Sequence, residues 1–322
     1  MGCGVVHHGT AKVAIVGTGF VGSTTAYAMM MNGVASRIAL IDAKKEKAEG
    51  EALDLLHGLQ FTHSVDIVAG DSFELVKEAD VVVITAGFAQ KSSGETRQDL
   101  LDKNVAVFQQ IIPEIVRYNQ DCILLVVTNP LDVLTYVTTK LSGFPRCRVF
   151  GTGTVLDTAR LRYLIGRHFN VSPKDVTAYI LGEHGDAEFL WASGAQIAGT
   201  PLNLFDGYSE SLLTDISLQT KNAVYDIIQK KGATYYAIAL GVVKIVRAIL
   251  LDQSRVFSVS TLVEDEFYGV RDICLSLPTI VRKSGVCERL PVVLSQHEQM
   301  LLRASSESIT RGINRANKLI GI

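Results

Sequence analysis

The sequence predicts an α/β protein in which a doubly wound parallel sheet is followed by an α+β domain. Between residues 12 and 150, short apolar runs alternate with segments of helical length, and this alternation is typical of a parallel sheet with helical crossovers. The runs are apolar at successive positions, so both faces of each strand should be covered by helices. The six runs are KVAIV, RIALI, VDIVA, VVVIT, CILLVV and VFG.

Helices are predicted where apolar residues recur with a spacing near 3.6. Residues 98–119 and 131–141 show this spacing, and Pro130 stands directly before the second helix. After Gly151 the pattern changes to a helix at 155–169, a strand at 177–182, mixed elements and an amphipathic terminal helix within 295–322. We therefore divide the chain into a tail (1–11), a first domain (12–150) and a second domain (151–322).

Composition narrows the class of function. Charged residues make up 20% of the 322 residues and the net charge is −2, so nucleic acid is not the expected partner. Five cysteines, an odd number without a CxxC pair, favour reduced thiols, no metal site and a cytoplasmic location. The most apolar helical stretch, 237–251, contains Lys244 and Arg247 and falls short of a membrane span.

A dinucleotide-binding motif follows the first predicted strand. In Gly17-Thr18-Gly19-Phe20-Val21-Gly22, the first glycine permits the tight turn, the second admits a pyrophosphate and the third allows close packing of helix on strand. Asp42 ends the second strand, where a carboxylate accepts hydrogen bonds from a ribose diol and repels a 2′-phosphate. The motif therefore predicts a Rossmann domain that binds NAD rather than NADP. The alternative is that the glycines serve only turns and Asp42 caps a helix.

Three further motifs carry groups suited to carbonyl reduction. His184 lies in LGEHGD after the strand TAYIL, and histidine exchanges protons near neutrality. Asp157 and Arg160 are three residues apart on one helix, so they face the same way, and Asp157 is a candidate partner for His184. Arg97 ends QKSSGETR, a polar segment with the character of a lid. Each group alone also has a plain interpretation, as a local ion pair or a solvated surface residue.

Six motifs follow one another along the chain: GTGFVG with Asp42, AGxxQK with GETR, TNPLDV, GTGTVLDTARLR, LGEHGD and KGATYYAIA. In this order, and over nearly the whole chain, they resemble the lactate and malate dehydrogenase family. The resemblance implies that His184 donates and accepts the proton, Asp157 orients it, Arg97 polarises the carbonyl and Arg160 binds the substrate carboxylate.

The same resemblance implies further contacts and an assembly. Asn129 would hydrogen-bond near substrate and nicotinamide, Thr234 would line the substrate pocket, and Ile238 would pack against the nicotinamide. It also implies a homo-oligomer, a tetramer or a dimer.

Substrate choice depends on the register of the predicted lid. In the family, a neutral Gln at the selecting position accompanies pyruvate and an Arg accompanies oxaloacetate. Gln90 holds that position when counted from Ala86-Gly87, which favours pyruvate and L-lactate, as does Thr234. Counted back from Arg97, the loop has one residue too many and Lys91 takes the position, which would favour malate. Other L-2-hydroxy acids and a non-catalytic binding protein are the remaining alternatives.

Overall fold

The computed structural model describes residues 11–89 and 97–322. The tail expected at 1–11 lies almost wholly outside these ranges, as do Gln90 and Lys91. Arg97 is the first residue of α3, and its side chain is also outside the described part.

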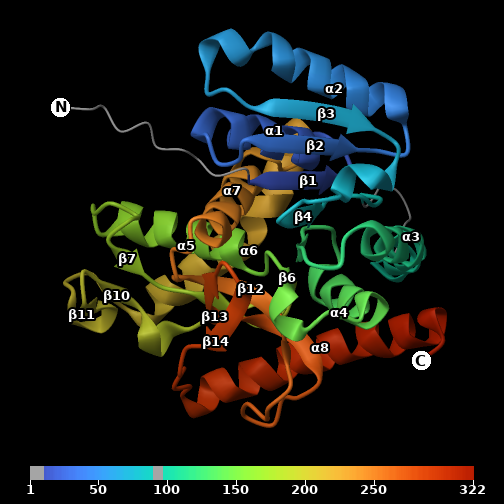
Figure 1. Cartoon of the computed structure of the whole chain (residues 1–322). Coiled ribbons are helices and arrows are strands. Elements are labelled where there is room, and N and C mark those ends of the chain that lie inside the picture. Colours follow the sequence, from blue (N-terminus) through green and yellow to red (C-terminus); the bar gives the residue numbers. More distant parts are fainter. Residues whose placement is uncertain (1–10, 90–96) are drawn as a thin grey trace.

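A single nine-stranded sheet runs through the molecule in the order β14-β13-β12-β6-β5-β4-β1-β2-β3 (Figure 1). The strands β1 to β6 are parallel, and their order is that of a doubly wound sheet. The predicted fold class is therefore confirmed. The bounds are β1 Lys12–Val16, β2 Arg37–Ile41, β3 Asp66–Gly70, β4 Val81–Ile84, β5 Ile123–Val126, β6 Val149–Gly151, β12 Arg255–Val263, β13 Ile273–Arg282 and β14 Gly285–Arg289.

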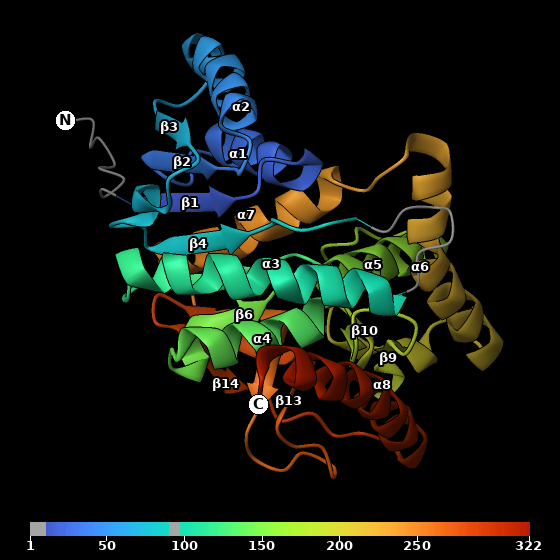
Figure 2. The same ribbon diagram turned by 90° about the vertical axis from the view of Figure 1, so that its right-hand side faces the viewer.

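Helices cover both faces of the sheet because its central strands are apolar at every position. Val13 and Ile15 of β1 pack in one core with α1, α2 and α7, whereas Ala14 and Val16 pack in the other with α3, α4 and α8. Figure 2 shows α3, α4 and α8 in front of the sheet and α7 behind it. The bounds are α1 Phe20–Asn32, α2 Lys45–His57, α3 Arg97–Tyr118, α4 Leu131–Ser142, α5 Val155–His168, α6 Glu210–Lys231, α7 Tyr236–Leu250 and α8 Gln296–Ile320.

The second half of the chain extends the same sheet. Strand β12 pairs antiparallel with β6 through Ser260 and Gly151, and β13 and β14 continue from it. A domain boundary near residue 150 stays a prediction, since backbone pairing continues across it.

The strand predicted at 177–182 is interrupted. Residues Val176–Thr177 (β7) pair with β10 (Gln196–Ile197), whereas Ile180–Leu181 (β8) pair with β9 (Phe189–Leu190). Between them, the carbonyl of Ala178 accepts a hydrogen bond from Nε of Arg162 at 2.9 Å. The chain thus changes sheets here, and β11 (Thr200–Pro201) completes the three-stranded sheet with β10 and β7.

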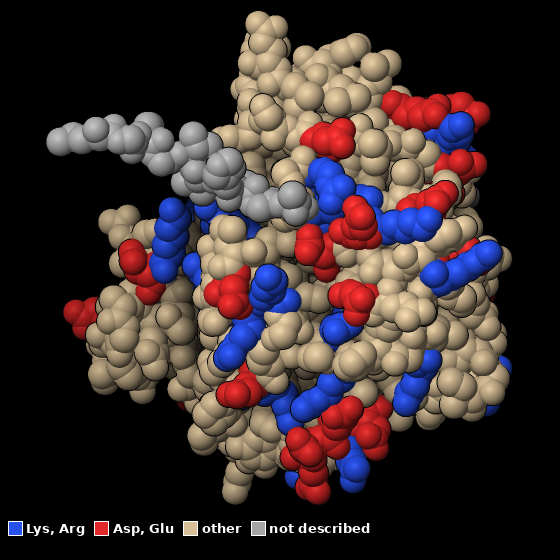
Figure 3. Space-filling view, in the orientation of Figure 1, with Lys and Arg blue, Asp and Glu red and all other residues tan. Residues whose placement is uncertain are grey.

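No helix in the two described ranges is both long enough and apolar enough to cross a bilayer. On the face shown in Figure 3, Lys and Arg side chains are interspersed with Asp and Glu side chains. This mixture matches the nearly neutral net charge of the sequence.

The turn from β1 into α1 depends on glycine at two positions. Gly17 has a φ of +98°, in the region that favours glycine. At Gly22, a Cβ would lie 1.9 Å from the carbonyl oxygen of Gly17, so the helix could not approach the strand. By contrast, Gly50 in α2 is exposed and has open space where a Cβ would be.

We expect Gly22→Ala and Gly50→Ala to have opposite effects on stability. Gly22→Ala should lower the free energy of unfolding by about 1–3 kcal/mol, because the backbone of the turn must shift. Gly50→Ala should raise it by roughly 0.5–1 kcal/mol, because alanine loses less conformational entropy in a helix. Urea unfolding followed by circular dichroism measures both, and equal effects of the two variants would contradict this account of the turn.

Candidate active site

The loop that carries His184 is anchored by a buried carboxylate. The backbone N–H of His184 donates to Oδ2 of Asp132 at 2.7 Å, and Oδ1 of Asp132 accepts from Oγ of Ser260 at 2.6 Å. Asp132 lies in the first turn of α4, and burial raises its pKa to about 6. One carboxylate therefore ties the loop to α4 and β12.

The terminal helix holds the same loop from the other side. The N–H of Glu183 donates to Oγ of Ser305 at 2.6 Å, and the Glu183 carboxylate accepts from Oγ of Ser308 at 3.1 Å. His184 consequently projects from a loop whose backbone is held by side chains of α4 and α8.

His184, Asp157 and Arg160 form one hydrogen-bonded chain. Nδ1 of His184 lies 2.6 Å from Oδ2 of Asp157, and Nη1 of Arg160 donates to Oδ1 of the same carboxylate at 2.9 Å. The Asp157 side chain is only 4% exposed, whereas that of His184 is 24% exposed. The structure therefore brings His184 to Asp157, the partner expected for it, and the local Asp157–Arg160 ion pair of the plain interpretation is present as well.

The charges of His184, Asp157 and Arg160 stabilise one another. Burial alone would lower the pKa of His184, but the Asp157 carboxylate raises it to about 9. Burial alone would raise the pKa of Asp157, but the charges of His184 and Arg160 hold it below its usual value. Because Nδ1 is bound to Asp157, Nε2 is the ring nitrogen left for proton exchange.

The predicted cofactor site is open where a pyrophosphate would lie. A Cβ on Gly19 would meet nothing within 4 Å, and Gly19 is the N-cap of α1, whose first turn has no acidic residue. A helix N-terminus with free N–H groups favours an anion. The glycine-rich turn therefore fits a dinucleotide.

Asp42 is held in place beside this turn. Oδ2 accepts from the N–H and hydroxyl of Thr18 at 2.8 and 2.9 Å, and Oδ1 accepts from the N–H of Lys44 at 3.0 Å. Burial acts to raise the pKa of Asp42, but these hydrogen bonds hold it below its usual value. Asp42 is thus ionised at neutral pH, and the lone pairs that remain can accept from a ribose diol.

The other predicted residues lie after β5 and at the starts of α1 and α7. Asn129 follows β5 and is exposed, while its carbonyl accepts from the buried Asn104 at 2.7 Å. Thr234 and Ile238 are half-buried at the start of α7, and the ring of Phe20 stacks on Tyr235 at 5.2 Å. Val21 is half-buried in the first turn of α1.

Two acidic residues of the site were missed from the sequence. Asp132 lies within TNPLDV and Glu188 lies four residues after His184, so both were near quoted motifs. Carboxyl oxygens of Glu188 and Asp157 and a ring nitrogen of His184 all lie within 4.8 Å of one another. Both Asp157 oxygens already accept hydrogen bonds from cationic partners, so we assign no metal to this cluster.

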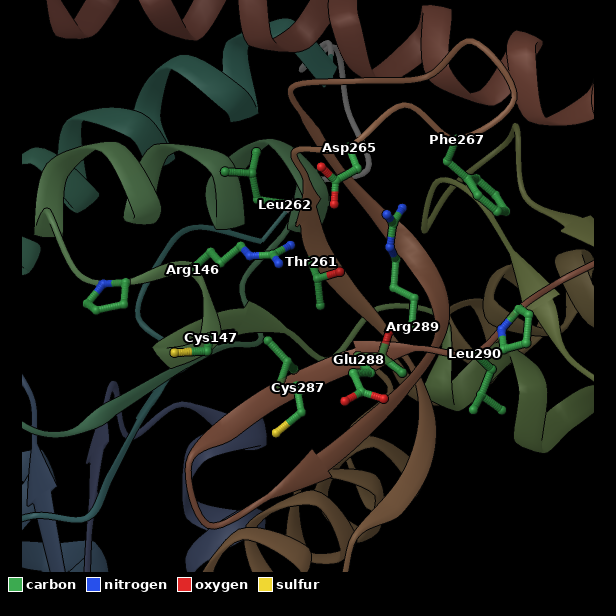
Figure 4. A pocket seen from close by; sticks show the side chains of 14 residues that line it. Arg146, Cys147, Thr261, Leu262, Asp265, Phe267, Cys287, Glu288, Arg289 and Leu290 are labelled. Carbon is green, nitrogen blue, oxygen red and sulfur yellow. The ribbon is translucent and has the colours of Figure 1, made fainter.

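A cavity of about 750 Å³ lies elsewhere, beside β13 and β14 (Figure 4). Arg146, Cys147, Cys287 and Arg289 are among its lining residues, and none of the predicted site residues lines it. It is therefore separate from the candidate active site.

Comparisons with known proteins cover both halves of the chain. Residues 11–151 match the NAD-binding domain of lactate/malate dehydrogenases, and residues 154–320 match the α/β C-terminal domain of the same family. An L-lactate dehydrogenase of Clostridium botulinum (strain 657 / Type Ba4) is 48% identical over 96% of this chain and 98% of its own length. One from Acetivibrio thermocellus is 51% identical over 92% of this chain and 95% of its own.

Solved structures agree with these relatives. A minor L-lactate dehydrogenase from Enterococcus mundtii superposes with a TM-score of 0.91 at 41% identity, covering 95% of this chain and 98% of its own. A lactate dehydrogenase from a Medee basin deep-sea metagenome library gives 0.91 at 40% identity, covering 96% and 99%. With both halves matched by one family's domains, this chain belongs to the NAD-dependent lactate/malate dehydrogenase family.

Proposed function

We propose that the chain is an L-lactate dehydrogenase, which transfers hydride reversibly between NADH and pyruvate. The observation that carries the proposal is the chain of hydrogen bonds from Arg160 through the buried Asp157 to His184. It provides an anchor for a carboxylate and a proton donor in one place, beside an edge suited to NAD. Relatives 47–51% identical are L-lactate dehydrogenases, which supports the same reaction.

The residues divide the work of carbonyl reduction. Bound NADH supplies the hydride, and the protein must supply a proton and stabilise the oxyanion. Protonated His184 gives the proton at Nε2 to the developing alkoxide, and Asp157 stabilises the imidazolium and fixes its tautomer. Arg160 donates once to Asp157, so its remaining N–H groups are left to bind the substrate carboxylate. Arg97, Asn129, Thr234 and Ile238 keep the roles that the resemblance implied.

We propose a homo-oligomer, a tetramer or a dimer, because α7 packs against α1 and α5 and all three helices expose large apolar side chains. These include Tyr27 and Met31 of α1, Tyr163 of α5, and Tyr236 and Leu240 of α7. Sedimentation equilibrium tests this, and a monomer would contradict it.

A cytoplasmic location is proposed because Cys122, Cys147, Cys274 and Cys287 are free thiols.

We expect pyruvate to be preferred over oxaloacetate, with Gln90 as the selecting residue. Absorbance of NADH reports the kcat/KM for each keto acid. Gln90→Arg should shift the preference toward oxaloacetate, because the second carboxylate would otherwise enter the site unpaired at a cost of about 2–5 kcal/mol. Lys91→Ala is the matched control and should leave the ratio nearly unchanged.

The opposite result identifies the second candidate function. If Lys91→Ala abolishes activity on oxaloacetate and Gln90→Arg changes little, the extra loop residue precedes the selecting position. The enzyme is then a malate dehydrogenase. No turnover of either keto acid by the wild type would contradict both assignments.

We expect Asp157→Asn to shift the pH dependence of pyruvate reduction. Reduction needs protonated His184, whose pKa is about 9, so reduction stops at the latest when the pH rises through that value. Without the carboxylate that pKa should fall by about 1–3, and the KM for pyruvate should begin to rise at correspondingly lower pH. At neutral pH kcat should also fall, by about 10²–10⁴-fold.

The double variant His184→Ala/Asp157→Asn serves as the control for this coupling. Because Asp157 acts through His184, its loss should add little once His184 is absent. A double variant whose loss equals the product of the two single losses would refute the coupling.

A further inference from the structure

Glu188 belongs to the same loop as His184 and folds back toward it. Its N–H donates to the carbonyl of Gly185 at 3.2 Å, which closes a turn immediately before β9. The turn brings a Glu188 carboxyl oxygen within 4.8 Å of both a His184 ring nitrogen and an Asp157 oxygen. A second carboxyl group thus lies beside the proposed proton donor.

The two carboxyl groups differ in their hydrogen bonds. Asp157 accepts at both oxygens from cationic partners. Oε1 of Glu188 is shielded from solvent and has no hydrogen-bond partner among the described residues. An ionised oxygen in that condition would be costly, whereas a neutral carboxyl group tolerates it better.

The charges around Glu188 come from three elements. Asp157 and Arg160 face it from α5, Lys221 faces it from α6, and His184 faces it from its own loop. Asp132 of α4 in turn lies against the backbone of His184. Burial and then the negative charge of Asp157 raise the pKa of Glu188 to about 8, against the opposing effects of His184, Arg160 and Lys221.

Two carboxyl groups so close in a poorly hydrated site do not both ionise readily. Asp157, with its two cationic partners, is the better anion, so the retained proton belongs to Glu188.

We propose that Glu188 is a positioning residue for the proton transfer. Its carboxyl group stays protonated during pyruvate reduction, and ionisation of this group stops reduction. This inference rests on the proposed function. The Glu188 proton is neither donated nor consumed in the cycle, since His184 supplies the proton that the alkoxide takes. An ionised Glu188 would repel the anionic substrate and would hold the His184 proton more tightly.

The proposal predicts how steeply activity falls at alkaline pH. In the wild type, both His184 and Glu188 must keep their protons. The kcat/KM for pyruvate should therefore fall about 100-fold per pH unit above the pKa values of both groups. Glu188→Gln mimics the neutral acid, and its kcat/KM should fall only about tenfold per pH unit. Asp186→Asn is the matched control, because it removes an exposed carboxylate from the same loop and should keep the wild-type slope. Short assays started from neutral stocks limit alkaline unfolding.

Infrared spectroscopy gives a second readout that needs no turnover. The wild type at pH 7 should show a protonated carboxyl band that disappears near pH 8 and is absent from Glu188→Gln. Were this variant unable to fold, the wild-type titration alone would still have to show such a band. Its midpoint is distinguishable from that of Asp132, whose pKa is about 6.

The outcomes separate this inference from the proposed function. Equal slopes in wild type and Glu188→Gln would overturn it, as would the absence of the carboxyl band at pH 7. A lower KM for pyruvate at pH 7 in Glu188→Gln would also overturn it, because a resident negative charge would have been removed. If the wild type reduced no pyruvate but showed the band, the proposed function would fail while the protonated Glu188 would stand.

Discussion

The site depends on the burial of one negative charge, that of Asp157. A carboxylate that is 4% exposed must be paired, because an unpaired charge in a poorly hydrated interior would take up a proton instead. Arg160 and His184 supply the pairing, one at each oxygen. Their positions, the pKa of the imidazole and the proton kept by Glu188 all follow from that requirement. The same hydrogen bonds therefore provide the catalytic geometry and pair the buried charge.

The sheet explains why such a charge can be held in place. Apolar strands covered on both faces leave polar groups only at strand ends, and the carboxyl ends of β1, β2, β4 and β5 meet at one edge. Asp42 and Asn129 lie there because each follows a buried strand. The His184 loop comes from the second half of the chain, and the Asp132 side chain of α4 holds it at this edge by accepting from the backbone N–H of His184. The pairing of β12 with β6 at Ser260 and Gly151 joins the two halves in one sheet.

Sequence patterns predicted the parallel strands almost residue by residue, because a buried strand needs apolar residues at every position. They were less successful at 177–182, where periodicity cannot show that the chain leaves one sheet for another. They also placed His184, Asp157 and Arg160 as candidates, since the i, i+3 spacing on one helix is a local property. Asp132 and Glu188 were missed because their importance arises from burial and from distant partners, which neighbouring residues in the sequence do not reveal. The roles of the predicted site residues stay predictions, as does the register of the segment around Gln90, because a local pattern fits either Gln90 or Lys91 at the selecting position.

The three acidic residues of the site show how environment divides one chemistry into separate tasks. Asp157 has two cationic partners and remains ionised. Burial raises the pKa of Asp132 to about 6, because its two donors, a backbone N–H and a hydroxyl, are neutral and offset the burial only in part. Burial, and then the Asp157 carboxylate beside it, raises the pKa of Glu188 further, to about 8, and one shielded oxygen of Glu188 has no donor among the described residues. Burial acts to raise all three pKa values, and only at Asp157 do the cationic partners outweigh it. Near neutrality, therefore, the group that holds the imidazolium is charged and Glu188 is neutral. This division allows an anionic substrate to approach a site that contains several acidic side chains.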